Sequence, residues 1–92
     1  MIKSFQHRGL KQYFIDANRK LLNPNQIKRI GLVLNALDYA RTVQDIDIVG
    51  AHLHELQGNR KGFWSVRVSG NWRITFRFET GHAYDVNLED YH

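Results

Sequence analysis

The sequence predicts an α+β fold in which two N-terminal helices pack on one face of a small, mainly antiparallel sheet. Apolar residues recur at helical spacing between residues 8 and 40, and they alternate with polar residues from residue 62 onward. Short polar turns that contain glycine separate the alternating runs. We therefore expect the order β-α-α-β-β-β-β, with residues 1–92 forming a single domain around one modest core.

The N-terminal part of the chain predicts a short strand followed by a helix. Residues 1–6 can form an edge strand. From about Arg8 the spacing changes to that of an amphipathic helix, whose apolar stripe consists of Leu10, Tyr13, Phe14 and Ala17. Residues 18–22 interrupt this pattern, so we expect the first helix to end before them.

A second helix is expected to begin at a well-marked N-terminus. Asn23 is a good N-cap, Pro24 suits the first helical position, and Gln26 stands where a capping-box partner would lie. Helical spacing then relates the apolar residues Ile27, Ile30, Val33, Leu34, Leu37 and Ala40. Two helices with one apolar face each can cover the apolar side of a sheet.

The middle of the chain carries weaker signals. Residues 42–51 lack a sustained period and predict a connection with about one turn of helix. Residues 52–56 predict a short strand, and residues 57–62 predict a polar loop that leads into three further strands.

These last three strands are expected to form an antiparallel meander with two different faces. One face would carry Trp64, Val66, Val68, Trp72, Ile74, Phe76, Phe78, Tyr84, Val86 and Leu88. The other would carry Ser65, Arg67, Arg73, Thr75, Arg77, Asp85, Asn87 and Glu89. The helices would cover the apolar face, and the polar face would be available for chemistry.

Composition and charge narrow the class of protein. The chain has no cysteine, so disulfides and thiolate metal sites are excluded, and no apolar run approaches the length of a membrane span. We therefore expect a cytoplasmic protein. The net charge of +4 resides in the first half, because residues 1–46 sum to +5 and residues 47–92 to −1. Basic helices that bind phosphates beside an acid-base site would explain this distribution, although a solvated helix surface would also explain it.

The titratable residues of the second half could carry out acid-base chemistry on RNA. The chain lacks a phosphate-binding glycine loop, a zinc-type spacing and a nucleophile elbow. It does carry His54, several cations in or beside the meander, and a terminal Asp90-Tyr91-His92. RNA scission by the ribose 2′-hydroxyl needs a base, a cation at the phosphoryl oxygens and an acid, and it requires no metal.

Other interpretations of these residues remain open. His52 and His54 would share one strand face and could bind a metal, but no third ligand is defined by spacing. A lone His54 is more often a hydrogen-bonded surface residue than a catalyst. Arg67 and Arg73 could instead form cross-strand ion pairs with Asp85 and Glu89.

Two segments and the order of elements together resemble the HigB toxins, a branch of the RelE-like superfamily, over essentially the whole chain. The segments are GFWSVRVSGNWRITFRF and the terminal LEDYH. The resemblance implies a RelE-like fold and a ribosome-dependent endonuclease that cuts mRNA in the decoding site. It also implies neutralisation by a HigA-type antitoxin with a helix-turn-helix fold, in a complex that binds operator DNA and represses its own promoter.

The resemblance assigns roles to individual residues. His54, Asp90, Tyr91 and His92 match active-site positions, and Arg73 matches an arginine that helps to bind the scissile phosphate. We expect Asp90 or His54 to act as the base, His92 as the acid and Tyr91 to orient the substrate. No metal or cofactor is expected.

Further cations would bind RNA, and one position departs from the family pattern. Ribosomal RNA would contact the helix residues Lys11, Arg19, Lys20, Lys28 and Arg29. Phosphate contacts near the active site would come from Arg60, Lys61 and Arg67. Gln57 stands where a relative has a lysine, so Arg60 or Lys61 would replace that charge. Two rival functions are a ribosome-binding protein that inhibits translation without cutting, and a structural role within a DNA-binding complex.

Overall fold

The computed structural model, which describes residues 1–48 and 51–90, has the predicted α+β class. The elements that it describes are the helices α1 (Arg8–Asp16) and α2 (Ile27–Tyr39), the 3₁₀ helices η1 (Pro24–Gln26), η2 (Val43–Ile46) and η3 (Gly58–Arg60), and the strands β1 (His54–Glu55), β2 (Phe63–Ser69), β3 (Trp72–Glu79) and β4 (His82–Asp90). The strands pair antiparallel in the order β1-β2-β3-β4. Among the described residues, no helix combines the length and apolarity needed to cross a membrane.

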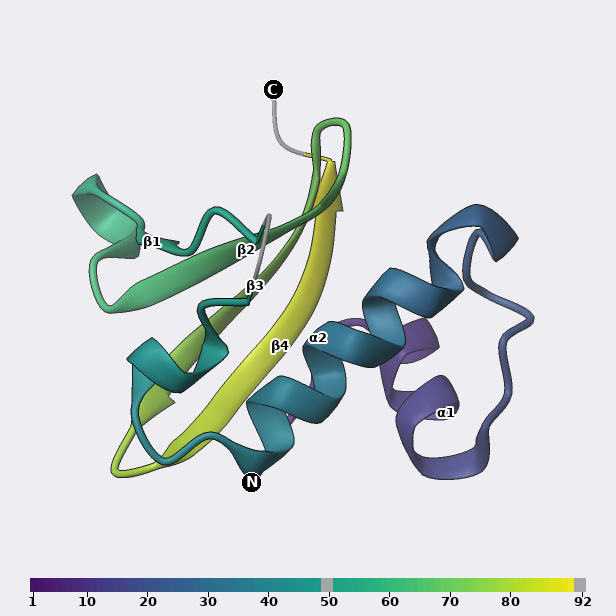
Figure 1. Cartoon of the computed structure of the whole chain (residues 1–92), viewed down its shortest axis with the longest axis horizontal. Helices are drawn as coiled ribbons and strands as arrows, with labels where there is room; N and C mark the ends of the chain where they lie inside the picture. The colour runs from purple at the N-terminus through teal and green to yellow at the C-terminus, as the bar shows by residue number, and fades with distance from the viewer. Residues whose placement is uncertain (49–50, 91–92) are drawn as a thin grey trace.

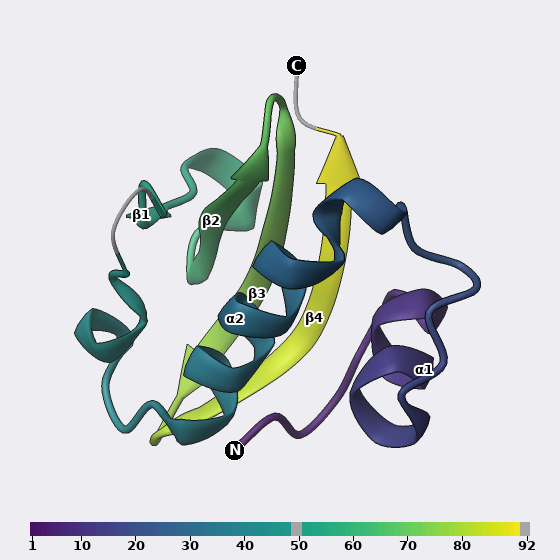
Figure 2. The same ribbon diagram turned by 45° about the vertical axis from the view of Figure 1, so that its right-hand side comes forward.

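The two helices lie on the same side of the sheet. Figures 1 and 2 show α2 crossing one face of the sheet, with α1 beyond the β4 edge. β1 forms the edge of the sheet opposite β4, and η3 follows it in the chain (Figure 1). In the part of the chain that the structure describes, the face of the sheet opposite α2 has no covering α-helix.

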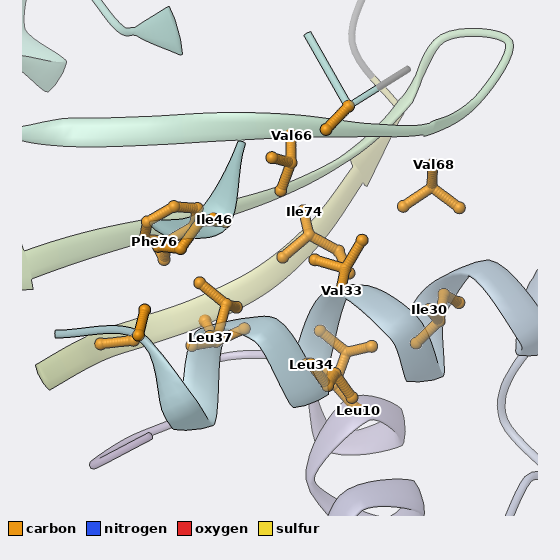
Figure 3. Close-up of a cluster of buried hydrophobic side chains, with 14 of the residues drawn as sticks. Leu10, Ile30, Val33, Leu34, Leu37, Ile46, Val66, Val68, Ile74 and Phe76 are labelled. Carbon is orange, nitrogen blue, oxygen red and sulfur yellow. The ribbon is translucent and has the colours of Figure 1, made fainter. Parts of the chain in front are cut away.

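The core lies between α2 and the apolar face of the sheet. Figure 3 shows side chains from α2, α1 and the sheet meeting in this layer. The predicted stripe of α2 is confirmed, because each of its six members is buried. Phe76 is fully buried in the middle of β3 and meets Phe78 edge-on, with ring centroids 6.5 Å apart. Burial of these side chains is the main stabilising contribution to the fold.

Helix α1 begins at a histidine cap and ends in a left-handed residue. Nδ1 of His7 accepts a hydrogen bond from the backbone N–H of Leu10 at 3.1 Å, so the ring must be neutral at this nitrogen. Partial burial lowers the pKa of His7 from its ordinary 6.5. The prediction that Ala17 belongs to the buried stripe is wrong, because Ala17 is the exposed C-cap residue with φ of 57°.

The start of the second helix differs from the prediction. Asn23 does cap a helical turn through its side chain, which accepts from the N–H of Asn25 at 2.9 Å, but this turn is η1, and α2 begins only at Ile27. Gln26 is no capping-box partner. Its side chain is buried and donates to Oγ of Ser69 at 3.0 Å, which ties the start of α2 to the end of β2.

The N-terminal segment lies at an edge of the sheet, beside β4, but it is not the regular strand that the sequence predicts. It makes two isolated parallel bridges to β4, at Ile2 and Phe5. Side-chain oxygens accept some of the hydrogen bonds that backbone carbonyls would accept in a regular ladder. Asp38 accepts from the N–H of Ile2 at 3.0 Å, and the Ser4 hydroxyl accepts from the N–H of Asp85 at 2.8 Å.

A β-bulge in β4 corrects one predicted face. The register of β3 and β4 shifts between Thr75 and Arg77, and Asp85 adopts a left-handed φ of 56°. The extra residue reverses the alternation, so Tyr84 lies opposite Arg77 and its ring contacts that guanidinium at 4.7 Å from the centroid. Ala83 takes the buried position instead. Tyr84 therefore belongs to the polar side and not to the core.

Truncation of the central aromatic residue should test the described core. We expect Phe76→Ala to lower the free energy of unfolding by about 3–5 kcal/mol, because it leaves a cavity under α2. Tyr39→Ala is the control, since Tyr39 is 84% exposed and its loss should change stability by less than about 0.5 kcal/mol. Chemical denaturation measures both, and similar losses in the two variants would contradict the assigned core.

The His7 cap predicts a pH-dependent stability. Because the folded pKa lies below the unfolded value of 6.5, the folded state resists protonation. The stabilisation is therefore complete above pH 6.5 and declines as the pH falls below it. The loss should not exceed the contribution of an N-cap bond, about 1 kcal/mol. Denaturation curves between pH 5 and 8 should show this decline relative to His7→Asn, which caps without titrating over that interval.

Candidate active site on the polar face of the sheet

Two rows of polar residues cross the sheet on the face opposite α2. In the first row, His54 pairs with Ser65, Ser65 with Thr75, and Thr75 with Asn87. In the second row, Arg67 lies opposite Arg73, and Arg73 lies opposite Glu89. We call these two rows together the polar face. Strand alternation predicted its β2 to β4 members, and the register supplies the alignment that the sequence alone could not.

His54 stands at the edge of the polar face and is exposed. Its Nδ1 lies 3.1 Å from the carbonyl oxygen of His52, and its Nε2 lies 3.4 Å from Oγ of Ser65. His52 does not share a strand face with His54, because it precedes β1 and has a left-handed φ of 49°. In the described part of the chain, no three residues of the types His, Cys, Asp and Glu come together as a metal site would require.

Arg67 and Arg73 are directly opposite each other on neighbouring strands. Like charges in this relation destabilise a sheet, and a bound anion would offset the repulsion. Nε and Nη1 of Arg73 are shielded from solvent. A guanidinium in such surroundings attracts a phosphate more strongly than one in bulk water.

Asp85 and Glu89 form ion pairs with arginines other than Arg67 and Arg73, the two considered from the sequence. Glu89 forms a two-pronged ion pair with Arg60, with contacts of 2.9 and 2.6 Å, and its Oε2 accepts from the Thr75 hydroxyl at 2.5 Å. Asp85 lies 3.5 Å from Arg77. We call Arg60, Thr75 and Glu89 the Glu89 cluster.

The Glu89 cluster changes the electrostatics of the polar face. The hydrogen bond from Arg60 is the main cause that lowers the pKa of Glu89 from its ordinary 4.5, and the Thr75 bond adds to it. Because the folded pKa is depressed, the ion pair stabilises the fold above about pH 4.5 and is lost as the pH falls below that value. Glu89 is therefore charged at neutral pH, beside the two opposed arginines.

The centre of the polar face is less open than the sequence suggests. Ser65 and Thr75 are fully buried although they lie on the face opposite α2. Their hydroxyls contact His54 and Glu89, side chains that extend over the face. A small hollow of about 190 Å³ remains beside His54, and its lining residues are His54, Glu55, Leu56, Gln57 and Arg60.

Asp90 is the last residue of β4, three residues beyond the row that contains His54. It pairs with Trp72, which precedes Arg73 on β3. Asn87, three residues before Asp90, is the β4 residue in the row of His54, and that row spans three strand spacings, about 14 Å on a flat sheet. The structure thus brings Asp90 near Arg73 but not beside His54. The predicted site residues Tyr91 and His92 lie outside the described residues.

The cations predicted to bind RNA fall into two groups. Arg60, Lys61 and Arg67 belong to the loop and strand that border the polar face. The others belong to the helical layer or its connections, namely Lys11, Arg19, Lys20, Lys28 and Arg29. The helix cations therefore do not surround His54. The start of α2 is tied to Ser69, at the same end of the sheet as Asp90.

Sequence reasoning missed two contributions to this site. Ser65 received no role, although it contacts His54, and Glu89 was considered only as a partner of the meander arginines. Alternation indicated that both residues lie on the polar face, which was the available signal. No local sequence pattern indicates that Arg60 extends from its loop across the sheet to Glu89.

Comparisons with known proteins indicate a family. A model for the family described as RelE-like toxin of type II toxin-antitoxin system HigB matches residues 3–92. The chain is 44% identical over 92 residues to a Proteus vulgaris protein named Endoribonuclease HigB, with 100% of both chains covered. It is 32% identical over 91 residues to Toxin HigB-1 of Vibrio cholerae, with 97% of this chain and 96% of that protein covered.

A solved structure shares the fold at low sequence identity. The crystal structure of a YafQ point mutant from E. coli superposes with a TM-score of 0.55 and 15% identity, covering 98% of this chain and 91% of that one. At this identity the likeness concerns the fold alone.

Proposed function

Because the chain belongs to the HigB family of RelE-like toxins from type II toxin–antitoxin systems, we propose that it is an endoribonuclease that cuts translated mRNA on the ribosome. The name of the Proteus vulgaris relative, an endoribonuclease, supports the reaction class. The ribosome as the place of cleavage rests on the family resemblance. Cutting mRNA there would stop translation and growth.

The observation that carries this proposal is that two arginines lie opposite each other on a sheet face whose edge strand carries His54. Arg67 and Arg73 face each other across β2 and β3, and His54 stands one strand further out. A phosphodiester bound at the arginines would relieve their repulsion. Its scissile bond would then lie on a face whose edge carries an imidazole, a side chain suited to proton transfer.

The proposed reaction proceeds without a metal. A base removes the proton of the ribose 2′-hydroxyl, and the 2′-oxygen attacks phosphorus. The bond from phosphorus to the 5′-oxygen breaks, and an acid gives that oxygen a proton, leaving a 2′,3′-cyclic phosphate and a 5′-hydroxyl. Arg73 stabilises the charge that grows on the phosphoryl oxygens.

The proton roles are divided among the remaining residues as the resemblance implies. His54 or Asp90 acts as the base, His92 as the acid, and Tyr91 orients the substrate. The position of Asp90 three strands from the edge that holds His54 favours different tasks for these two residues.

Partners follow from the type II system. We propose a HigA-type antitoxin with a helix-turn-helix fold, through which the complex binds operator DNA.

Cations on the helical layer would contact ribosomal RNA, a role that should appear as a steep decrease of ribosome binding with salt. Substituting Lys28 and Arg29 together should make that decrease less steep.

A modified substrate should test the reaction. An mRNA with a 2′-deoxy nucleotide at the cut site should resist cleavage because the nucleophile is missing, whereas the all-ribose mRNA should be cut when ribosomes are present. Primer extension locates the cut, and mass analysis of the fragment ends identifies the cyclic phosphate. Normal cleavage of the deoxy substrate would contradict the mechanism, and growth arrest with intact mRNA would favour a non-cleaving inhibitor.

Matched pairs of variants should test the site. We expect Arg73→Ala and His54→Ala each to lower the cleavage rate by roughly a hundredfold, the usual scale for phosphoryl and acid-base groups. Arg77→Ala, on the same strand, and His52→Asn, two residues before His54, are the controls and should retain nearly full activity. Equal losses within a pair would show that general damage to the sheet, and not the assigned role, causes the effect.

A further inference from the structure

The loop between β1 and β2 is attached to the polar face through one side chain that reaches two strands away. The N–H of Leu56 donates to the carbonyl of Phe63 at 2.8 Å and closes the base of the loop. Gly58 and Gly62 adopt positive φ values of 72° and 93°, so the chain turns sharply on both sides of η3. From η3, Arg60 extends to Glu89 on β4, whose carboxylate also accepts from the Thr75 hydroxyl on β3.

The Glu89 cluster differs from an ordinary surface ion pair. Both oxygens of the carboxylate bind the guanidinium, and Thr75, which is 1% exposed, donates to the same carboxylate. The side chain of Glu89 is 24% exposed, whereas that of Glu79, which pairs with Arg77, is 58% exposed. Two-pronged, partly buried pairs hold a defined geometry, whereas exposed single contacts contribute little.

The same arginine also lines the hollow beside His54. Arg60 forms part of its wall, together with Gln57, and its guanidinium lies 5.8 Å from the centre of the Phe63 ring. Because Arg60 is held by Glu89, the position of this wall relative to His54 depends on a residue of β4. The cluster therefore links the edge of the sheet that carries His54 to the strand that carries Asp90.

We propose that the Glu89 cluster is a positioning device that holds loop 57–62 over the polar face and fixes the hollow beside His54 for the RNA strand. Glu89 is then a positioning residue that acts through Arg60, and Arg60 serves as a wall and not primarily as a phosphate ligand. The catalytic consequence rests on the proposed endoribonuclease function, whereas the structural consequence does not.

An opposite role for Glu89 makes the proposal testable. If the carboxylate merely occupied a phosphate site, its removal would free Arg60 for RNA, and Glu89→Gln would bind and cut RNA better than the wild type. If the carboxylate positions the loop, the same variant loosens the loop and cuts more slowly. The two roles thus predict changes of opposite sign.

The experiment compares Glu89→Gln with Glu79→Gln in the full chain. We expect Glu89→Gln to lower the cleavage rate by roughly 10- to 100-fold, mainly in kcat, because a displacement of about 1 Å near the reacting groups has effects of this size. Without RNA, backbone hydrogen exchange at loop 57–62 should become severalfold faster. Glu79→Gln removes an exposed ion pair of the same sheet and should change neither measurement.

Further variants separate a positioning role from a loss of folding. Glu89→Asp retains the charge and should recover part of the activity and of the loop protection. Thr75→Val keeps the buried shape but removes one hydrogen bond, so it should shift both readouts in the same direction as Glu89→Gln, by a smaller factor. Both variants remain informative if Glu89→Gln fails to fold.

The outcomes distinguish this proposal from the proposed function. If the wild type cuts no RNA but loop exchange still accelerates in Glu89→Gln, the endoribonuclease function fails and the positioning role of the cluster stands. If the wild type cuts RNA and Glu89→Gln cuts equally well or better, the positioning role is overturned. Unchanged loop exchange in a folded Glu89→Gln also overturns it.

Discussion

The contact between α2 and the apolar face of the sheet is the constraint on which the remaining structure depends. Ile30, Val33, Leu34 and Leu37 meet Val66, Ile74 and Phe76 in a fully buried layer. Once this layer forms, strand alternation assigns every other residue of β2 and β3 to the opposite side. The arginines and hydroxyls of the polar face therefore have their places because α2 covers the other face.

The fold could be predicted to the extent that local patterns determine it. The stripe of α2 and the alternation in β3 are long and regular, so they specified the elements, the faces and the α+β class. The errors occur where a tertiary contact overrides a local preference. The Gln26 side chain donates a hydrogen bond to Ser69 of β2 instead of capping α2. A bulge at Asp85 moves Tyr84 to the other face of the sheet. The residues next to Gln26 and Asp85 in the sequence indicate neither the hydrogen bond nor the bulge.

The residue types on this face could be predicted from the sequence, but which residues stand opposite each other on neighbouring strands could not. Alternation placed Arg67 and Arg73 on one face, and the resemblance selected Arg73, His54 and Asp90. Which residues stand opposite each other depends on strand register, which the sequence does not state. The register sets Arg67 against Arg73 and puts two strands, β2 and β3, between His54 and the strand of Asp90. The pairing of Arg60 with Glu89 depends on the path of the loop between β1 and β2, and no local sequence pattern indicates that path.

The balance of charge on the polar face explains why a carboxylate stands among groups that would bind RNA. Arg67, Arg73 and Arg60 together would repel one another in the absence of RNA, and Glu89 offsets one of these charges. The face keeps a net positive charge, so it still attracts a phosphate. Because Glu89 is held by Arg60 and Thr75, it cannot turn toward the other arginines without breaking three hydrogen bonds. A carboxylate held in this way can offset the charge of the arginines before RNA binds, which is the behaviour expected of a preorganised site.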